Sequence, residues 1–320
     1  MSVKNAEKDS QQRKKSMSMN SQEKPRVVLP QNANLTEQSL QLISSEMEVV
    51  GQPPDPRDLF ETPADIYFAP LGYTFTQATA DLMPGLRIVV SPTTSRQHIA
   101  YDVDVTVICL EGNPILQEIT SVSELTIAMA IMLTRNVKHA MESVQEGHEW
   151  NRFPFGGEKM LSEMTLGIVG MGRIGTHVAN FGYMFSEVWT INDEPREADI
   201  VTLHLPLNNE TKGMVDMEFI SQMKRGSYLI NTSRGEIVQD DIIVDALKSG
   251  QLAGYACDCL AGEFSADFNP KHSPLWRAMV GWPDLNIIIT PHIGGSTKDA
   301  WQLTQETVIK EALECWHTSL

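Results

Sequence analysis

A glycine pattern of the type G-x-G-x-x-G stands at Gly170-Met171-Gly172-Arg173-Ile174-Gly175. It follows the apolar run Leu166–Val169 and precedes a helical pattern, which is the context in which such a turn can bind a dinucleotide pyrophosphate. The first glycine would form the tight turn, the second would let backbone approach the phosphates, and the third would allow close packing of helix on strand. The free N–H groups at the start of the helix would then face the phosphates.

A dinucleotide fingerprint also needs an acid about 20 residues further on, to accept hydrogen bonds from the adenosine ribose. Asp193 lies 18 residues after Gly175 and is the candidate. A carboxylate there would repel a 2′-phosphate and would favour NAD over NADP, although Arg196 close by leaves NADP open. The alternative is an ordinary strand–turn–helix with an unrelated surface aspartate.

Polar residues follow three further apolar runs that are typical of strands. Parallel strands are expected because strands and helices alternate along the chain, and doubly wound parallel sheets bind ligands beyond the carboxyl ends of their strands. Taken one at a time, each of these residues could equally be structural. They are Thr232-Ser233-Arg234-Gly235 after Tyr228–Asn231, Asp258 and Glu263 after Ala253–Cys257, and His292, Gly294 and Gly295 after Ile287–Thr290.

Five strings, in this order, resemble the D-isomer-specific 2-hydroxyacid dehydrogenases, with phosphoglycerate dehydrogenase-like members the most similar. The strings are GIVGMGRIG, DIVTLHLPL, LINTSRGEIV, LAGYACD and TPHIGGST. The resemblance extends from about residue 65 to 315. It implies an oxidoreductase that transfers a hydride between NAD(H) and a small D-2-hydroxy acid or 2-keto acid.

The resemblance also assigns roles to individual residues. Arg234 would hold the substrate carboxylate in its planar fork. His292 would take the hydroxyl proton as hydride leaves C2 and return it in the reverse direction. Glu263 would bond the other ring nitrogen and stabilise the imidazolium. The expected cofactor contacts are Gly170, Gly172, Arg173, Ile174, Gly175, Asp193, Thr232, Ser233, Arg234, Asp258, His292, Gly294 and Gly295.

Two departures from the family concern the expected substrate loop and the cofactor domain. In the expected substrate loop, Thr94 and Ser95, serine stands where the family has a glycine, and a Cβ there restricts positive φ. After Asp193 only six residues precede the next apolar run, Ile200–Leu205, where the family has a further strand and helix. The cofactor domain is therefore expected to carry an internal deletion.

This deletion predicts a distorted strand. In the usual order the strand ending near Asp193 and the strand Ile200–Leu205 flank Leu166–Val169. The link must return ~17 Å along the strands and cross ~10 Å sideways. Six extended residues span at most ~20–22 Å. We therefore expect Glu187–Asp193 to be shortened, displaced or frayed, and NAD to bind weakly.

The expected fold class is α/β, with two doubly wound parallel-sheet domains: a flavodoxin-like substrate domain and a shortened Rossmann NAD-binding domain. Residues 1–25 are polar and are expected to form a disordered tail. The substrate domain would combine 26–120 with 297–320, and the NAD-binding domain would be 121–296. The helical pattern 121–143 and a last helix, Thr297 to about Cys315, would connect them.

Composition limits the partners and the compartment. A formal net charge of −16 disfavours nucleic acid and anionic lipid. No uninterrupted apolar run reaches the roughly 18 residues of a membrane span. Four cysteines without zinc or thioredoxin spacing indicate reduced thiols, no metal site and a cytoplasmic protein.

Two further expectations concern partners. By resemblance the chain should form a homodimer through residues 121–155, where Trp150, Phe153 and Phe155 could meet a second copy or pack on their own domain. The small anionic 2-hydroxy or 2-keto acid is the expected substrate. An alternative function is an inactive or dinucleotide-sensing dehydrogenase-fold protein that acts as a protein-interaction module.

Overall fold

The computed structural model describes residues 23–318 apart from residues 59–60, 97, 149, 158, 192–196 and 266. The described chain divides into two compact units. The first contains the residues up to Gly112 and those from Gln302 onward, and the second is Asn113–Trp301. We call them the terminal unit and the central unit.

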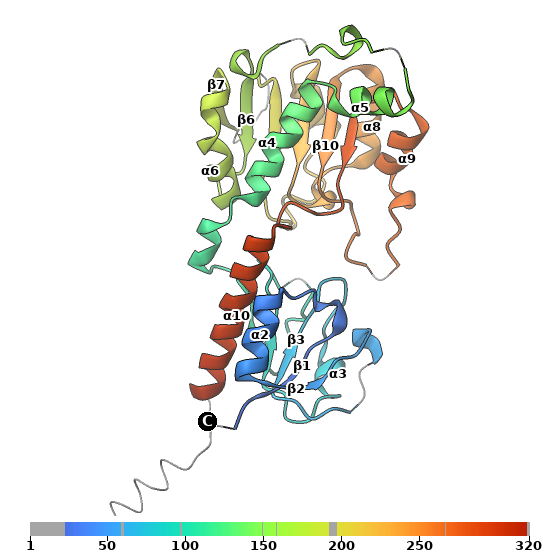
Figure 1. Ribbon diagram of the computed structural model, residues 1–320. Coiled ribbons are helices and arrows are strands. Elements are labelled where there is room, and N and C mark those ends of the chain that lie inside the picture. Colours follow the sequence, from blue (N-terminus) through green and yellow to red (C-terminus); the bar gives the residue numbers. More distant parts are fainter. Residues whose placement is uncertain are drawn as a thin grey trace, which may run out of the picture. The chain divides into compact units, whose positions relative to one another are not determined.

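The terminal unit is built on a five-stranded parallel sheet (Figure 1). The strand order β2-β1-β3-β4-β5 is that of the flavodoxin-like doubly wound fold, which confirms the predicted class. The strands are β1 (Arg26–Val28), β2 (Glu48–Gly51), β3 (Ile66–Phe68), β4 (Ile88–Val90) and β5 (Thr106–Ile108).

Two ends of the chain meet in the terminal unit. Thr36 caps the helix that follows it, since its side chain accepts from the backbone N–H of Ser39. The side chain of Gln305 then accepts from the Thr36 N–H and donates to the carbonyl of Asn34. The C-terminal helix is thus hydrogen-bonded to the N-terminal segment. The helices are α2 (Glu37–Glu46), α3 (Gln77–Ala80) and the part of α10 (Lys298–Thr318) from Gln302 onward, with short 3-10 turns at Gln31–Ala33 and Pro56–Asp58.

The central unit contains a six-stranded parallel sheet in the order β11-β10-β9-β8-β6-β7. The full dinucleotide-binding order has two strands beyond the first one, whereas the described residues form one strand, β7, beyond β6. The sheet is therefore shortened on this side, as expected. The strands are β6 (Thr165–Val169), β7 (Glu187–Ile191), β8 (Ile200–Leu203), β9 (Ser227–Asn231), β10 (Leu252–Cys257) and β11 (Ile287–Ile289).

Helices cover both faces of this sheet (Figure 1). Buried side chains of α4 and α6 pack with Leu166, Ile168 and Ile230 on one face. Buried side chains of α7, α8 and α9 pack with Val201, Leu229 and other strand residues on the opposite face of the sheet. Alternate strand residues thus serve two cores, as in a doubly wound sheet. The helices are α4 (Ser121–Thr134), α5 (Val137–Gln145), α6 (Arg173–Asn180), α7 (Met217–Gln222), α8 (Asp240–Ser249) and α9 (Pro274–Gly281).

The expected helix over 121–143 is two helices, because the chain turns at Asn136. This residue has a left-handed backbone with φ of 47°, which asparagine tolerates better than most residues. The buried Asn286 amide donates to the Leu133 carbonyl and to Asn136 Oδ1. It therefore holds the end of α4 and the start of α5 together.

The division between the units lies at other residues than expected. Residues 113–120 and 297–301 group with the central unit rather than with the terminal one. One physical cause is Arg173 at the start of α6, whose Nη1 donates to the carbonyls of Leu116 and Ile119, 3.0 Å away in each case. These bonds attach the segment before α4 to the central unit.

The prediction that Glu187–Asp193 is shortened or displaced is wrong for its described part. β7 pairs with β6 along its whole length, Ile191 opposite Val169, while Ile200 at the start of β8 lies opposite Leu166. Between the end of β7 and the start of β8 the chain therefore has to go back along the strand direction by three residues, ~10 Å, rather than by five. The eight residues 192–199 are available for this, and extended chain of that length spans ~26–29 Å.

Residues Pro114–Thr134 are long and apolar enough to cross a membrane by length and composition, and 44% of the most apolar window is buried. They include α4, whose Met129, Ala130 and Leu133 are fully buried against the central sheet. A helix packed in this way is typical of a protein core.

Candidate functional site

The glycine pattern forms the expected strand–turn–helix between β6 and α6. Gly170 has φ of 94°, and a Cβ on it would lie 2.5 Å from the His204 carbonyl oxygen. A Cβ on Gly175 would lie 2.0 Å from the Gly170 carbonyl oxygen, so both positions require glycine. By contrast, a Cβ on Gly172 would meet nothing within 4 Å. The turn therefore has two glycines that the fold needs and one that leaves space for a ligand, which fits a pyrophosphate.

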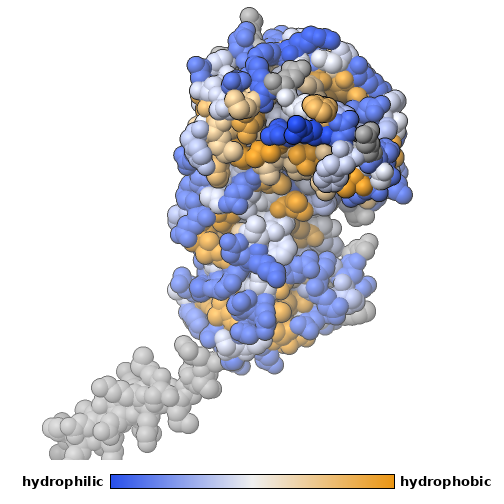
Figure 2. Space-filling view, turned by 45° about the horizontal axis from the view of Figure 1, so that its top comes forward, coloured by the Kyte–Doolittle hydropathy of each residue, from blue (hydrophilic) through white to orange (hydrophobic). Residues whose placement is uncertain are grey.

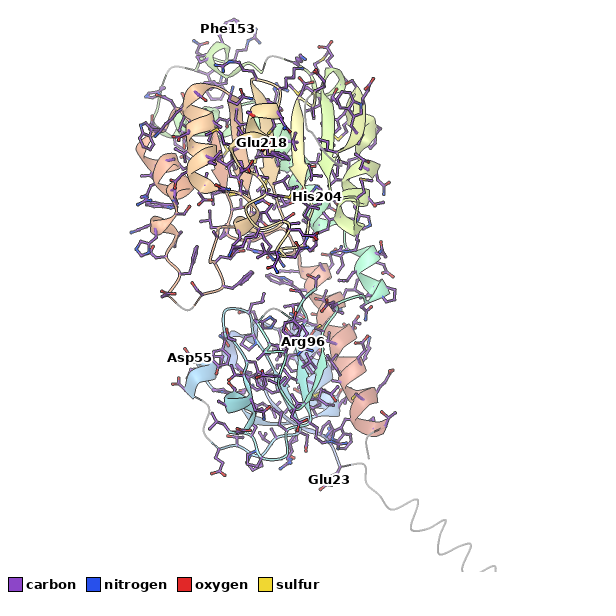
Figure 3. All side chains as sticks on the ribbon, turned by 180° about the vertical axis from the view of Figure 1, so that it is seen from behind. Glu23, Asp55, Arg96, Phe153, His204 and Glu218 are labelled. Atoms are coloured by element: carbon purple, nitrogen blue, oxygen red, sulfur yellow. The ribbon has the colours of Figure 1, made fainter. Side chains whose placement is uncertain are left out.

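His204 adds an unpartnered polar group beside this turn (Figure 3). Its backbone N–H donates to the Val169 carbonyl, so it lies next to Gly170. Both ring nitrogens are buried without a hydrogen-bond partner among the described residues, and burial lowers the pKa of the imidazole to about 4. From the sequence alone His204 is expected to be structural, since a histidine inside an apolar run resembles a core residue.

Three other residues were expected to contact the cofactor, and the structure gives a different result for each. The guanidinium of Arg173 is used in the two carbonyl contacts of the central unit, and burial lowers its pKa. Ile174 packs against the core between the sheet and α4. Asp193 lies outside the described residues.

The turn after β9 presents Arg234. The buried Asn231 amide accepts from the Ser233 N–H and donates to the Arg234 carbonyl. The Ser233 hydroxyl donates to the Leu203 carbonyl and accepts from the Leu205 N–H, which joins the ends of β8 and β9. Asn231 is not among the site residues predicted from the sequence, although an amide at the last position of a strand is a signal for such a turn.

The Arg234 side chain has a hydrogen-bond donor that no described residue satisfies. Its Nη1 donates to the Ser233 carbonyl at 2.7 Å, while its Nε is buried and has no partner among the described residues. A charged donor without an acceptor is costly inside a protein. A carboxylate of a ligand would satisfy it, as the prediction for Arg234 requires.

Asp258, after β10, holds the loop that follows β11. The residue is 3% exposed, and its carboxylate accepts from the Thr290 hydroxyl at 2.5 Å, the Ile293 N–H at 2.8 Å and the Gly294 N–H at 2.6 Å. A Cβ on Gly294 would lie 2.8 Å from Asp258 Oδ2, so this close approach needs glycine. Asp258, which was expected to contact the cofactor, thus makes its described side-chain hydrogen bonds with the histidine loop.

That loop presents His292 to Glu263. The Nδ1 of His292 lies 2.7 Å from Oε1 of Glu263, and the His292 side chain is 38% exposed while that of Glu263 is 13% exposed. His292 has φ of 53°, a left-handed backbone that is uncommon in residues other than glycine and occurs often at functional sites. The ring of Phe264 lies 5.5 Å from the imidazole, centroid to centroid. The expected pair of histidine base and glutamate carboxylate is therefore present. The other ring nitrogen of His292 does not take part in this contact.

The remaining expected residues of the central unit lie around this cluster. The Thr232 hydroxyl is 3.1 Å from that of Thr126 on α4, so it contacts protein. Gly295 has open space where a Cβ would be. Cys257 and Cys259 are buried, and burial raises the pKa of both thiols, so neither is poised as a nucleophile.

The expected substrate loop lies after β4 in the terminal unit. Thr94 is exposed and Ser95 is half-buried, and the Ser95 carbonyl accepts from the Thr93 hydroxyl at 2.7 Å. Within the described ranges, positive φ at residues other than glycine occurs at Asn34, Asn136 and His292. Ser95 therefore takes an ordinary backbone conformation, and its Cβ causes no strain.

Comparison with known proteins gives a family. The model described as the D-isomer specific 2-hydroxyacid dehydrogenase, NAD binding domain, matches residues 127–187 and 183–294. D-specific alpha-keto acid dehydrogenase of Enterococcus faecium is 38% identical over 213 residues, 61% of this chain and 65% of that protein. D-3-phosphoglycerate dehydrogenase of Bacillus subtilis (strain 168) is 36% identical over 214 residues, 61% of this chain and 38% of that protein. The matches thus span less than two thirds of these curated relatives.

Solved structures share the fold of nearly the whole chain. D-lactate dehydrogenase from Aquifex aeolicus, complexed with NAD and lactic acid, has a TM-score of 0.71 at 24% identity and covers 92% of this chain and 95% of its own. The pyruvate reductase of Chlamydomonas reinhardtii has a TM-score of 0.76 at 20% identity and covers 91% and 96%. At these identities the likeness concerns fold.

The two matched stretches locate the interruption in the cofactor domain. They share residues 183–187, so the likeness to the family breaks just before β7 rather than after Asp193. Asp193 therefore belongs to the second stretch, with β8, and not to the stretch that carries Gly170–Gly175. Its spacing from Gly175 consequently does not identify it as the ribose-binding acid.

Proposed function

The chain belongs to the D-isomer specific 2-hydroxyacid dehydrogenase family, and from this we propose that it transfers a hydride between NAD(H) and a small D-2-hydroxy or 2-keto acid. NAD is the cofactor of the matched domain. When bound it supplies or accepts the hydride. The Gly170–Gly175 turn and the start of α6 would hold its phosphates.

The reaction assigns one task to each of three side chains. Arg234 binds the carboxylate of the substrate, and its buried Nε without a partner supports this role. His292 removes the proton from the C2 hydroxyl in oxidation and donates it to the carbonyl oxygen in reduction. Glu263, 2.7 Å from His292 Nδ1, orients the ring and stabilises its charged form.

The observation that carries this proposal is the contact between His292 and Glu263. Like Arg234, both residues lie beyond the carboxyl ends of strands of the central sheet. The experiment is NADH oxidation by the purified chain with a panel of 2-keto acids, compared with His292→Ala. Turnover that this substitution abolishes supports the proposal. Turnover that it leaves unchanged contradicts the assignment of His292.

A second candidate function is a dehydrogenase fold that binds dinucleotide without turnover and acts as a protein-interaction module. The interruption of the family match at residues 183–187 and the single described strand, β7, beyond β6 favour it, because a shortened sheet offers fewer contacts to the dinucleotide. Quenching or a shift of NADH fluorescence without oxidation by any keto acid of the panel would support this function instead.

We also propose a homodimer through residues 121–155. Trp150 and Phe153 are 91% and 81% exposed, and large exposed aromatic side chains are typical of protein interfaces. A groove of about 610 Å³ lies along α4 and α5, lined by Ile131, Met141, Val144 and four neighbours. Apolar side chains also reach the surface of this unit in the view of Figure 2. Sedimentation at micromolar concentration tests the proposal, since a 35.7 kDa species alone would contradict it.

A cytoplasmic location is the last part of this proposal. It is supported by the four cysteines, all in the described part of the chain, none of which forms a disulfide, as is usual in reducing compartments. Fractionation of cells that express the tagged chain tests it, and recovery with membranes or in the medium would contradict it.

A further inference from the structure

Phe264 directly follows Glu263 on the turn after β10, and its ring contacts the same imidazole as the glutamate does. The ring centroids of Phe264 and His292 lie 5.5 Å apart, and the two ring planes are tilted by 55°. Such a separation is usual for a favourable aromatic pair. Two consecutive residues of one turn therefore contact His292, Glu263 at its Nδ1 and Phe264 through its ring.

The turn that carries both side chains is fixed by the chain around it. The Gly262 N–H donates to the carboxylate of Glu236 at 2.9 Å. The turn also approaches Gly235 closely, since a Cβ on Gly235 would lie 2.1 Å from the Ala261 nitrogen. Gly235 and Glu236 directly follow Arg234 in the chain. The turn after β10 is therefore held beside the turn after β9, and both belong to the central unit.

The His292 imidazole needs more than one contact to keep a single orientation. Its side chain is 38% exposed, and partly exposed side chains change rotamer within picoseconds to nanoseconds. The bond to Glu263 alone leaves the ring free to turn about that bond. The neighbouring ring of Phe264 restricts this rotation. Phe264 is itself 37% exposed, so filling a core does not account for a large aromatic side chain at this position.

We propose that Phe264 is a positioning residue for the acid–base step. Its ring confines the His292 imidazole to the orientation in which Nδ1 faces Glu263 and Nε2 is left for the substrate proton. The inference rests on the proposed function, in which His292 transfers that proton. Phe264 acts through the imidazole, so its effect does not depend on which 2-keto acid is bound.

The first test is steady-state reduction of keto acids by the full chain. Phe264→Ala should lower kcat by about 3- to 10-fold, the contribution of an aromatic pair, and leave the KM values for NADH and keto acid nearly unchanged. The loss should be equal with pyruvate and with phenylpyruvate. Phe264→Tyr keeps the ring and should restore kcat. Tyr183→Ala, which removes an aromatic side chain that is 83% exposed, is the control.

Three kinetic results would overturn the inference. The first is a wild-type kcat in Phe264→Ala, and the second is a kcat in Phe264→Tyr as low as that of Phe264→Ala. The third is a loss confined to phenylpyruvate, because Phe264 would then contact the side chain of the substrate rather than position His292.

NMR of the imidazole tests the inference even if no keto acid is turned over. The chain is labelled with isotope-enriched histidine, and the His292 signals are those absent from His292→Ala. At a pH where the ring is neutral, a ring held by both contacts has its proton on the nitrogen that faces Glu263. Phe264→Ala should move both nitrogen signals toward those of Glu263→Ala, the reference for a ring without its carboxylate partner. Unchanged signals overturn the inference. Changed signals in a chain without turnover support the orienting contact and count against the proposed function instead.

Discussion

The Nδ1 of His292 lies 2.7 Å from Oε1 of Glu263, although 29 positions separate the two residues in the chain. Two strand ends bring them together, since Glu263 follows β10 and His292 follows β11, and these strands are paired neighbours. The carboxylate occupies one ring nitrogen and leaves the other for a substrate proton. The pair is therefore arranged as a histidine acid–base with an orienting partner.

His292→Ala should reduce turnover by about 10²–10⁴-fold, the usual contribution of general acid–base catalysis. Steady-state kinetics with NADH and the best keto acid measures it, and His272→Ala, which removes an exposed histidine, is the control. Glu263→Gln should keep turnover in part but move the upper pH limit of keto-acid reduction to lower pH, because the charged imidazole loses its carboxylate. An unchanged pH profile would contradict the role of Glu263.

Asp258 should be needed for the shape of the histidine loop. Asp258→Ala leaves the Thr290 hydroxyl and the N–H groups of Ile293 and Gly294 without their acceptor, which costs roughly 2–4 kcal/mol. For a unit of this size that lowers Tm by about 5–15 °C. Thermal unfolding of this variant and of Asp267→Ala, an exposed control, measures the difference. Equal Tm values would show that the three bonds contribute nothing to stability.

The strands and the site residues at their carboxyl ends could be predicted from the sequence, because apolar runs, glycine spacing and strand alternation are local signals. The flavodoxin-like order and the pairing of Glu263 with His292 follow from such signals combined with the resemblance. The break at Asn136 could not be predicted, because it depends on the amide of Asn286, which is remote in sequence.

The link between β7 and β8 shows a second feature that could not be predicted from the sequence. The link expected from the sequence begins after Asp193 and returns the length of a full strand, whereas the register places Ile200 opposite Leu166 and Ile191 opposite Val169. Strand register is set by packing on both faces of the sheet and is not visible in a run of apolar letters. The buried Nε of Arg234, which has no partner among the described residues, is likewise a property of the folded chain.

Two glycine substitutions should separate folding from cofactor binding. Gly175→Ala places a methyl group 2.0 Å from the Gly170 carbonyl oxygen and should lower Tm strongly. Gly172 has φ of −72° and open space beyond its Cα, so Gly172→Ala should leave Tm nearly unchanged. The added methyl group should nevertheless weaken NADH binding about tenfold or more, because it occupies the space through which phosphate approaches the backbone. Fluorescence titration measures the affinity, and wild-type affinity in Gly172→Ala would show that the phosphates bind elsewhere.

Stability should depend on pH through Asp240 at the start of α8. Burial raises the pKa of this carboxyl to about 6, despite the hydrogen bond that it accepts from the Ser273 hydroxyl, and the nearby Asp241 and Glu236 act in the same direction. In the unfolded chain the group ionises near its ordinary value of 3.8. Between these two values the folded state binds the proton more tightly, so the free energy of unfolding falls as pH rises from about 4 to 6.5, by at most roughly 3 kcal/mol.

Asp240→Asn removes this titration while its amide oxygen can still accept from Ser273. The variant should therefore be more stable than the wild type at pH 7.5 and similar to it at pH 4.5. Urea unfolding at the two pH values measures the difference, with Asp245→Asn, an exposed carboxylate of the same helix, as the control for charge alone. If Asp240→Asn and Asp245→Asn change stability between pH 4.5 and 7.5 by the same amount, burial of Asp240 is not the cause of the pH dependence.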